Sequence, residues 1–208
     1  TYGADVKLPG MLYAVVARPP VVGGTVKSVD DSAALDVPGV QRIEMIPGTS
    51  LGAKFKPKGG VAVIADSTWA ALKGRQALEI EWDDGPHGSF NTADYRKELS
   101  ASANAPGKSV RSQGDTEGAL KSAARVLSYE YYQPHLAHSP MEPPAAVASV
   151  TNGKAEVWAP VQSPYGTRVD VADYLGMDEK DVTQRVTPRW RGRAQVQVRL
   201  CQRGPPSV

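Results

Sequence analysis

The 208-residue chain contains a single cysteine, Cys201, and this scarcity excludes two kinds of site. One thiol cannot form an internal disulfide framework, and an iron–sulfur centre needs about four thiolate ligands. Any iron–sulfur centre that works together with this chain must therefore lie elsewhere.

Long apolar runs are missing as well. No run of about 18 apolar residues occurs, so no segment is predicted to span a bilayer. Residues 1–5 lack the charged and apolar regions of a signal peptide, so no export signal is visible, and the sequence leaves cytoplasm and periplasm open. An apolar fraction of 41% with 22% charged residues suits one or two folded domains and argues against global disorder.

The formal net charge of +2 hides an uneven distribution. Residues 185–208 hold six arginines and neither lysine nor acid, which leaves 18 basic against 22 acidic residues elsewhere. A basic tail that binds phosphate or nucleic acid is one interpretation. The tail lacks the interleaved aromatic residues of single-strand binders, so nucleic-acid binding is not favoured.

Common catalytic motifs are absent too. The sequence has no phosphate-binding or dinucleotide-binding glycine pattern, and its Ser-Pro serines lack the glycine elbow of a hydrolase nucleophile. With only three histidines, no nucleophile–base set emerges. We therefore predict no catalytic residue within this stretch.

Residues 1–83 alternate between strand-like and helix-like patterns. Residues 61–65 (VAVIA) are a continuous apolar run, which predicts a strand buried on both faces. Residues 78–82 (LEIEW) alternate between apolar and charged side chains, which is typical of a half-exposed strand. Further strands are predicted at 12–18 and 40–46, with a short helix ending at Leu35 and another over 69–76. The segment is therefore an α/β or α+β unit.

The following residues predict a second set of elements. Residues 84–113 read as an interdomain connection containing one helix, from Thr92 to Ser102. Asn152-Gly153 between two strand-like segments is the signal of a tight hairpin. Helices are also predicted at 115–124 and 164–175, and strands at 125–132 and 182–187.

Two segments of this second part carry a distinctive pattern. Residues 135–148 read HLAHSPMEPPAAVA, and residues 152–164 read NGKAEVWAPVQSP. This pattern resembles the molybdopterin-binding subunit of the xanthine dehydrogenase and aldehyde oxidase family, and within it the isoquinoline 1-oxidoreductase beta-subunit type. In the first part, residues 37–40 (VPGV) and 66–71 (DSTWAA) resemble landmarks of the family's α/β-hammerhead domain.

The resemblance implies an α+β chain: an α/β-hammerhead domain at 1–83, a linker at 84–113, and the start of a molybdenum cofactor-binding domain at 114–187. An anomalous arginine-rich tail follows at 188–208. It also implies that the parent subunit oxidises an aldehyde or N-heterocycle with water as the oxygen source. The implied cofactor is molybdenum–molybdopterin, in its cytosine dinucleotide form in bacterial relatives, and electrons leave through a [2Fe–2S] partner subunit.

One residue carries the predicted cofactor contact. By the resemblance, Gln162 corresponds to the glutamine whose amide N–H contacts an oxygen ligand of the metal. A neutral donor stabilises an electron-rich oxygen without adding charge beside the reacting centre. The alternative is an ordinary loop residue before a helix.

Three further groups have plain structural interpretations. His135, His138 and Glu142 could form a metal site by residue type, but the family holds its metal through the pterin, so a structural role for Glu142 is favoured and no protein metal ligand is predicted. Since the hammerhead domain is a scaffold in relatives, Trp69 and Trp82 are expected in the core, with Trp69, Leu72 and Gln76 on one helical face. The lysines 54, 56 and 58 beside two glycines suggest a phosphate loop or, with more weight, a solvated hairpin tip.

The resemblance stops near residue 186. Relatives continue into a glycine-rich loop, whereas residues 188–195 here read PRWRGRAQ. A one-base slip converts glycine codons into arginine codons, so a frameshift is one hypothesis for the tail, to be tested by reading the flanking DNA in all frames. Because the general base of relatives lies far towards the C-terminus, we expect this chain alone to be inactive and to hold no molybdenum.

The alternative function is a non-catalytic interaction module built on the hammerhead domain.

Overall fold

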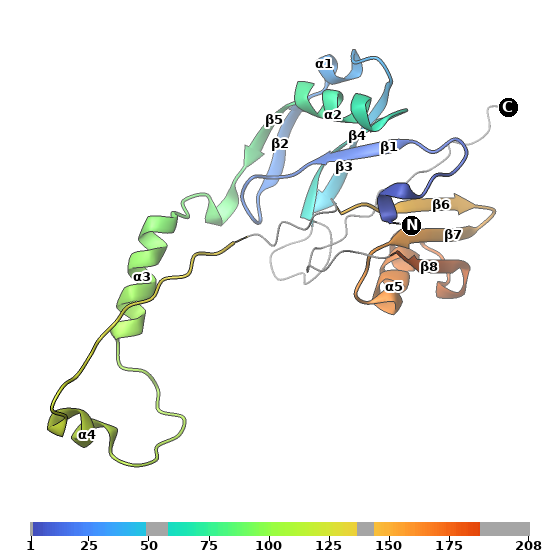
Figure 1. Cartoon of the computed structure of the whole chain (residues 1–208). Helices are drawn as coiled ribbons and strands as arrows, with labels where there is room; N and C mark the ends of the chain where they lie inside the picture. Colours follow the sequence, from blue (N-terminus) through green and yellow to red (C-terminus); the bar gives the residue numbers. More distant parts are fainter. Residues whose placement is uncertain (1, 49–57, 137–143, 188–208) are drawn as a thin grey trace. The chain divides into compact units, whose positions relative to one another are not determined.

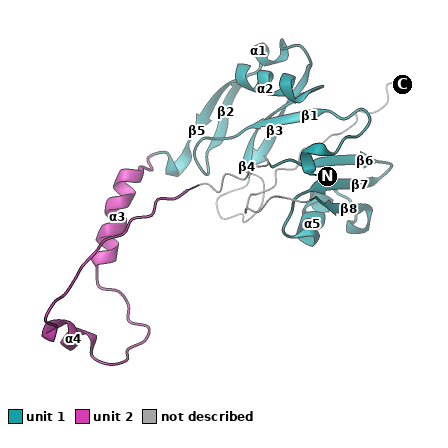
Figure 2. Cartoon of the chain, viewed as in Figure 1, with its two compact units in different colours: residues 1–88, 138–208 teal, residues 89–137 magenta. Residues whose placement is uncertain are grey.

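The computed structural model describes residues 2–48, 58–136 and 144–187 (Figure 1). Residues 1–88 together with 138–208 form one compact unit, and residues 89–137 form a second (Figure 2). The predicted mixture of helices and strands is confirmed. Every helix in the described part of the chain is too short or too polar to span a bilayer.

The first sheet of the larger unit is antiparallel and has the order β1-β4-β3. It consists of β1 (Tyr13–Ala17), β4 (Lys58–Ala65) and β3 (Val40–Gly48). From Gly59 to Ala65 the central strand is buried throughout. The continuous apolar run therefore forms a strand that is buried on both faces, as its composition predicts.

A second, two-stranded sheet pairs β2 (Thr25–Asp30) with β5 (Glu79–Asp83) in antiparallel fashion. Along β5 the acidic side chains are exposed, whereas Ile80 and Trp82 are half-buried. The alternation seen in the sequence thus separates a polar from an apolar face, as predicted.

Two helices accompany these sheets: α1 (Ser32–Leu35) and α2 (Thr68–Ala77). The Ser67 hydroxyl caps α2 by accepting a hydrogen bond from the backbone N–H of Ala70, at 3.1 Å. The buried face of α2 consists of Ala70, Ala71 and Gly74, and α2 contacts both β1 and β4.

The prediction that Trp69 belongs to the core is wrong. Its side chain is 69% exposed, and Lys73 lies over the indole with Nζ 4.8 Å from the ring centroid. A β-carbon on Gly74 would come within 2.8 Å of side-chain atoms of Val40 and Val63. The helix therefore packs through its smallest residues, and a face bearing an indole would hold it away from the sheet.

The smaller unit contains the helices α3 (Thr92–Asn104) and α4 (Thr116–Ser122). Asn91 caps α3 by accepting hydrogen bonds from the first-turn N–H groups, and Asp115 caps α4 in the same way. The strand predicted at 125–132 is absent: residues 125–136 form neither helix nor strand, and their backbone makes no backbone hydrogen bond within the described part of the chain. Strand composition alone does not form a ladder without a neighbouring strand.

The third sheet has the order β6-β7-β8 and belongs to the larger unit. It consists of β6 (Val147–Thr151), β7 (Lys154–Ala159) and β8 (Val182–Val186). The β6–β7 hairpin turns at Asn152 and Gly153, whose φ angles of 52° and 71° suit the predicted tight turn.

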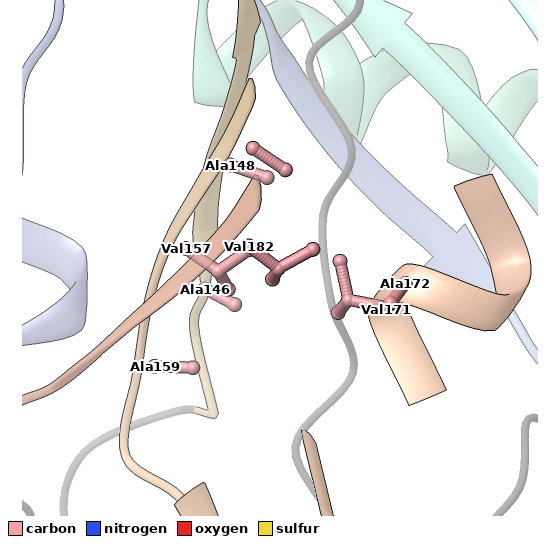
Figure 3. Packing of buried hydrophobic residues seen from close by; sticks show 8 residues of the cluster. Ala146, Ala148, Val157, Ala159, Val171, Ala172 and Val182 are labelled. Atoms are coloured by element: carbon pink, nitrogen blue, oxygen red, sulfur yellow. The ribbon is translucent and has the colours of Figure 1, made fainter. Parts of the chain in front are cut away.

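Helix α5 (Pro164–Leu175) connects β7 to β8, which run parallel to each other. The helix stops at Gly176, in the left-handed region with φ 63°. Val157 and Val182 from the sheet, together with Val171 and Ala172 from the helix, belong to one buried core (Figure 3). This core holds the loop between β7 and α5 in place.

Candidate functional site

Gln162 lies on the short connection between the end of β7 and the start of α5. The backbone turns immediately after the strand, because the N–H of Val161 donates to the carbonyl oxygen of Ala159 at 3.0 Å. The Gln162 side chain is exposed. The predicted cofactor residue therefore stands at a strand-to-helix junction and outside the closed core.

This junction lies at the carboxyl ends of two parallel strands. Ala159 at the end of β7 is paired with Val186 at the end of β8. Because the two strands run in the same direction, the residues that follow each of them lie at the same edge of the sheet. This is the edge at which α/β sheets bind their ligands. The parallel pairing could have been anticipated from the strand–helix–strand order, but the sequence interpretation did not use it.

The N-terminus of α5 contributes a second feature of this edge. Ser163 is the N-cap, and its hydroxyl accepts a 3.3 Å hydrogen bond from the backbone N–H of Gly166. No acidic residue occupies the first turn. The partial positive charge of the helix N-terminus is thus left without a neighbouring carboxylate of its own helix.

The Gln162 amide is free to bind a ligand. None of its polar atoms has a hydrogen-bond partner in the described part of the chain, so both the amide N–H groups and the carbonyl oxygen are available. A neutral donor beside a helix N-terminus fits an oxygen atom of a metal centre or of an anionic cofactor. The residues present are compatible with a molybdopterin group in this respect.

Two ion pairs involve charged residues of this sheet and helix. Arg185 on β8 pairs with Glu156 on β7, and Arg168 on α5 pairs with Glu179 at 3.2 Å. Lys154 on β7 and Asp170 and Asp173 on α5 have no ion-pair partner among the described residues.

Thr187, directly after β8, is buried, and its hydroxyl has no hydrogen-bond partner among the described residues. That oxygen lies 3.5 Å from the position a β-carbon on Gly3 would take. It therefore faces the N-terminal 3-10 turn, η1 (Gly3–Asp5), and we assign it no ligand contact.

The other candidate residues are not assembled into a site. His135 is exposed and its ring stacks on Tyr95 with centroids 5.6 Å apart, whereas His138 and Glu142 lie outside the described residues. Lys58 is the first residue of β4 and is exposed. Lysines 54 and 56 lie outside the described residues. Within the described ranges, no three histidine, cysteine, aspartate or glutamate side chains are grouped to hold a metal.

Comparison with known proteins agrees with the predicted family. Residues 101–190 match the molybdopterin cofactor-binding domain. The chain is 30% identical over 192 residues to the beta subunit of isoquinoline 1-oxidoreductase from Brevundimonas diminuta, covering 88% of this chain and 23% of that protein. It is 28% identical over 187 residues to a nicotinate dehydrogenase subunit of Pseudomonas putida, covering 86% of this chain and 15% of that protein.

Solved structures support the same fold. Quinoline 2-oxidoreductase from Pseudomonas putida 86 superposes with a TM-score of 0.61 at 23% identity, over 89% of this chain and 28% of that one. The matched domain model is one of molybdopterin binding, and the shared fold is that of molybdenum hydroxylase structures. In sequence the chain is similar to part of the molybdenum-binding subunits of the xanthine oxidase family, whose members are molybdenum-dependent oxidoreductases. It spans about a quarter or less of the length of the two relatives named above.

Proposed function

We propose that this chain contributes to a molybdenum hydroxylase that oxidises an aldehyde or an N-heterocycle with oxygen taken from water. The family match supports the chemistry, and the names of two relatives, isoquinoline 1-oxidoreductase and nicotinate dehydrogenase, refer to N-heterocycles. In this proposal residues 1–83 are the α/β-hammerhead scaffold, 84–113 are the linker, and 114–187 begin the cofactor-binding domain.

The observation that carries the proposal is the exposed amide of Gln162, which lies just after the carboxyl end of β7 and has no hydrogen-bond partner among the described residues. We assign its N–H the role of donating a hydrogen bond to an oxygen atom of the cofactor's metal centre. When bound, that centre supplies Lewis-acid activation and accepts the electrons of the oxidation. The amide orients the oxygen and stabilises its negative charge without introducing a titrating group.

The neighbouring backbone supports this role. Ser163 begins α5 directly after Gln162, and its cap fixes where the helix starts. The hydrogen bond between Val161 and Ala159 fixes the turn on the other side. The amide is therefore carried by a connection held at both ends, which lowers the entropy lost when it binds.

The cofactor and partner are proposed in more detail on chemical grounds. We propose the cytosine dinucleotide form of molybdopterin, and a separate iron–sulfur subunit with a [2Fe–2S] centre as the electron acceptor. The presence of one cysteine in 208 residues is consistent with iron–sulfur ligation on another polypeptide.

We further propose that this stretch by itself is inactive and retains no molybdenum. The interaction-module alternative is not favoured, because the matched domain lies at 101–190 and not in the hammerhead segment.

The test compares two preparations. The first is this 208-residue chain, and the second is the product of the complete reading frame that contains it, produced with its iron–sulfur partner in a host that makes the cofactor. Molybdenum is measured by elemental analysis and the pterin by its fluorescence after oxidation. We expect both groups in near-stoichiometric amounts in the second preparation, together with dye reduction by an aldehyde or N-heterocycle. A second preparation without molybdenum or pterin would refute the proposed function, and stoichiometric metal in the first would refute the inactivity of the chain alone.

A further inference from the structure

A cavity of about 330 Å³ lies in the first part of the larger unit, and Gln162 is not among its lining residues. It forms where β1 and α2 end and β5 passes, and it is open to solvent. Its lining residues are Ala17, Arg18, Arg75, Leu78, Ile80 and Trp82. Its volume lies at the lower end of the range of small-molecule sites, roughly 300–1,000 Å³.

Arg18 contributes a positive charge to this cavity, and one hydrogen bond holds its side chain in place. Its Nη1 donates a 2.6 Å hydrogen bond to the carbonyl oxygen of Gly59, and its Nε is buried without a hydrogen-bond partner in the described part of the chain. Burial lowers the pKa of this guanidinium, but an arginine stays protonated near neutral pH. The side chain is thus held in place by one contact while donors remain unused.

Arg75 supplies a second positive charge from the last turn of α2. Its side chain is exposed, and no described carboxylate lies within ion-pair distance of it. It therefore resembles Arg18 in having no acidic partner among the described residues. Two guanidiniums without a described carboxylate partner create a positive potential that attracts an anion.

The alternation along β5 gives the cavity three apolar side chains, although polar atoms make up the larger part of its exposed lining. Leu78, Ile80 and Trp82 line the cavity, whereas Glu79 and Glu81 are exposed on the other face of the strand. Glu81 is engaged there by Lys27 at 2.5 Å. No carboxylate is among the described residues that line the cavity, so none of these residues repels a bound anion.

We infer that this cavity binds a small organic carboxylate with an aromatic or aliphatic body. The two guanidiniums suit a carboxylate, which guanidinium groups bind through paired N–H donors. The indole of Trp82 and the two aliphatic side chains suit the body. An inorganic anion would contact only the two arginines. The three apolar side chains would stay in contact with water, so we expect an inorganic anion to bind less tightly.

The inference is tested with the whole chain and 2-naphthoate as the probe. Binding is followed by isothermal titration calorimetry, and the Trp82 indole N–H resonance locates it. We expect a Kd on the order of 1 mM, the affinity typical of a ligand of this size. The neutral analogue 2-naphthalenemethanol and inorganic phosphate should each bind at least about 5-fold more weakly, because each lacks one half of the complementarity.

Matched variants separate the cavity from general charge. Arg75→Gln should weaken naphthoate binding roughly 3- to 10-fold, and Arg18→Lys should weaken it too by losing the planar donor pair. Lys73→Gln removes the same charge from the same helix outside the cavity and should change the Kd less than about 2-fold. No saturable binding at about 10 mM probe, an undisturbed Trp82 resonance, or equal effects of Arg75→Gln and Lys73→Gln would each overturn the inference. Tighter binding of an oligoglutamate peptide than of naphthoate would overturn it as well, in favour of an acidic protein partner.

Discussion

The backbone N–H of Thr187 donates a 3.2 Å hydrogen bond to the carbonyl oxygen of Ala159. This bond continues the β7–β8 pairing one residue beyond Val186, where β8 ends. The two chain segments that leave the parallel strands are thereby held together at the sheet edge. The connection that carries Gln162 begins directly after Ala159, so the position of Gln162 depends on both strands.

Gly74 should be one of the least replaceable residues of the first part of the chain. A β-carbon there would lie 2.8 Å from side-chain atoms of Val40 and Val63. We expect Gly74→Val to lower the free energy of unfolding by about 2 kcal/mol or more, because the close approach of α2 to the sheet would be lost. Urea denaturation followed by circular dichroism measures the change. Lys73→Val on the exposed side of the same helix is the control, and equal stabilities of the two variants would contradict the packing described here.

Asp30 should show a depressed pKa. The side-chain hydroxyl and then the backbone N–H of Ser32, at 2.6 Å and 3.0 Å, donate to its carboxylate and lower the pKa of Asp30 below its ordinary value. Since the folded-state pKa is the lower one, the stabilisation is complete above the unfolded-state pKa and is lost as the pH falls through the folded-state pKa.

Carbon-13 NMR titration of the carboxyl group measures this effect directly. We expect the Asp30 midpoint to lie below about 3.9, the ordinary value of an aspartate in an unstructured peptide. Ser32→Ala should move the Asp30 midpoint upwards, since it removes the hydroxyl donor. An Asp30 midpoint that does not respond to Ser32→Ala would show that the hydroxyl does not act on the carboxylate.

Residues 125–132 should exchange their amide hydrogens rapidly. Their backbone makes no backbone hydrogen bond among the described residues, and Leu127, Tyr129 and Tyr131 are 57%, 72% and 89% exposed. Hydrogen–deuterium exchange in the whole chain should give near-unprotected rates there and strong protection at Val157, in the centre of its sheet. Protection of 125–132 comparable to that of Val157 would reveal a pairing that the structure does not contain.

Much of the local structure follows from the sequence because local chemistry determines it. The Asn152-Gly153 turn needs two residues that tolerate positive φ, and α5 needs only Ser163, Pro164 and Gly176 to set its ends. The strand β4 is recognisable because a run of apolar residues requires cover on both faces. Gln162 falls between such well-marked elements, so its place at a strand-to-helix junction is predictable.

Other features depend on contacts between distant residues. Trp69 reads as a core residue, but the close approach of Gly74 to Val63 decides which face of α2 is buried. Residues 125–132 read as a strand, but a strand exists only when another segment pairs with it. The cavity brings together Arg18 and Arg75, which lie far apart in the chain, and no local pattern announces it.

The most direct test of the account is the effect of Gln162→Ala on the molybdenum hydroxylase proposed above, produced from the complete reading frame together with the proposed iron–sulfur subunit. We expect molybdenum and pterin contents to stay near those of the unmodified enzyme, while kcat falls roughly 10- to 100-fold, as for other groups that hydrogen-bond to a metal's ligands. The electron paramagnetic resonance signal of the partly reduced metal should shift as well. Gln76→Ala, which removes an exposed glutamine from α2, should change neither quantity. If Gln162→Ala leaves both the turnover rate and the metal's spectrum unchanged, the amide does not face the cofactor and the assignment of this site is contradicted.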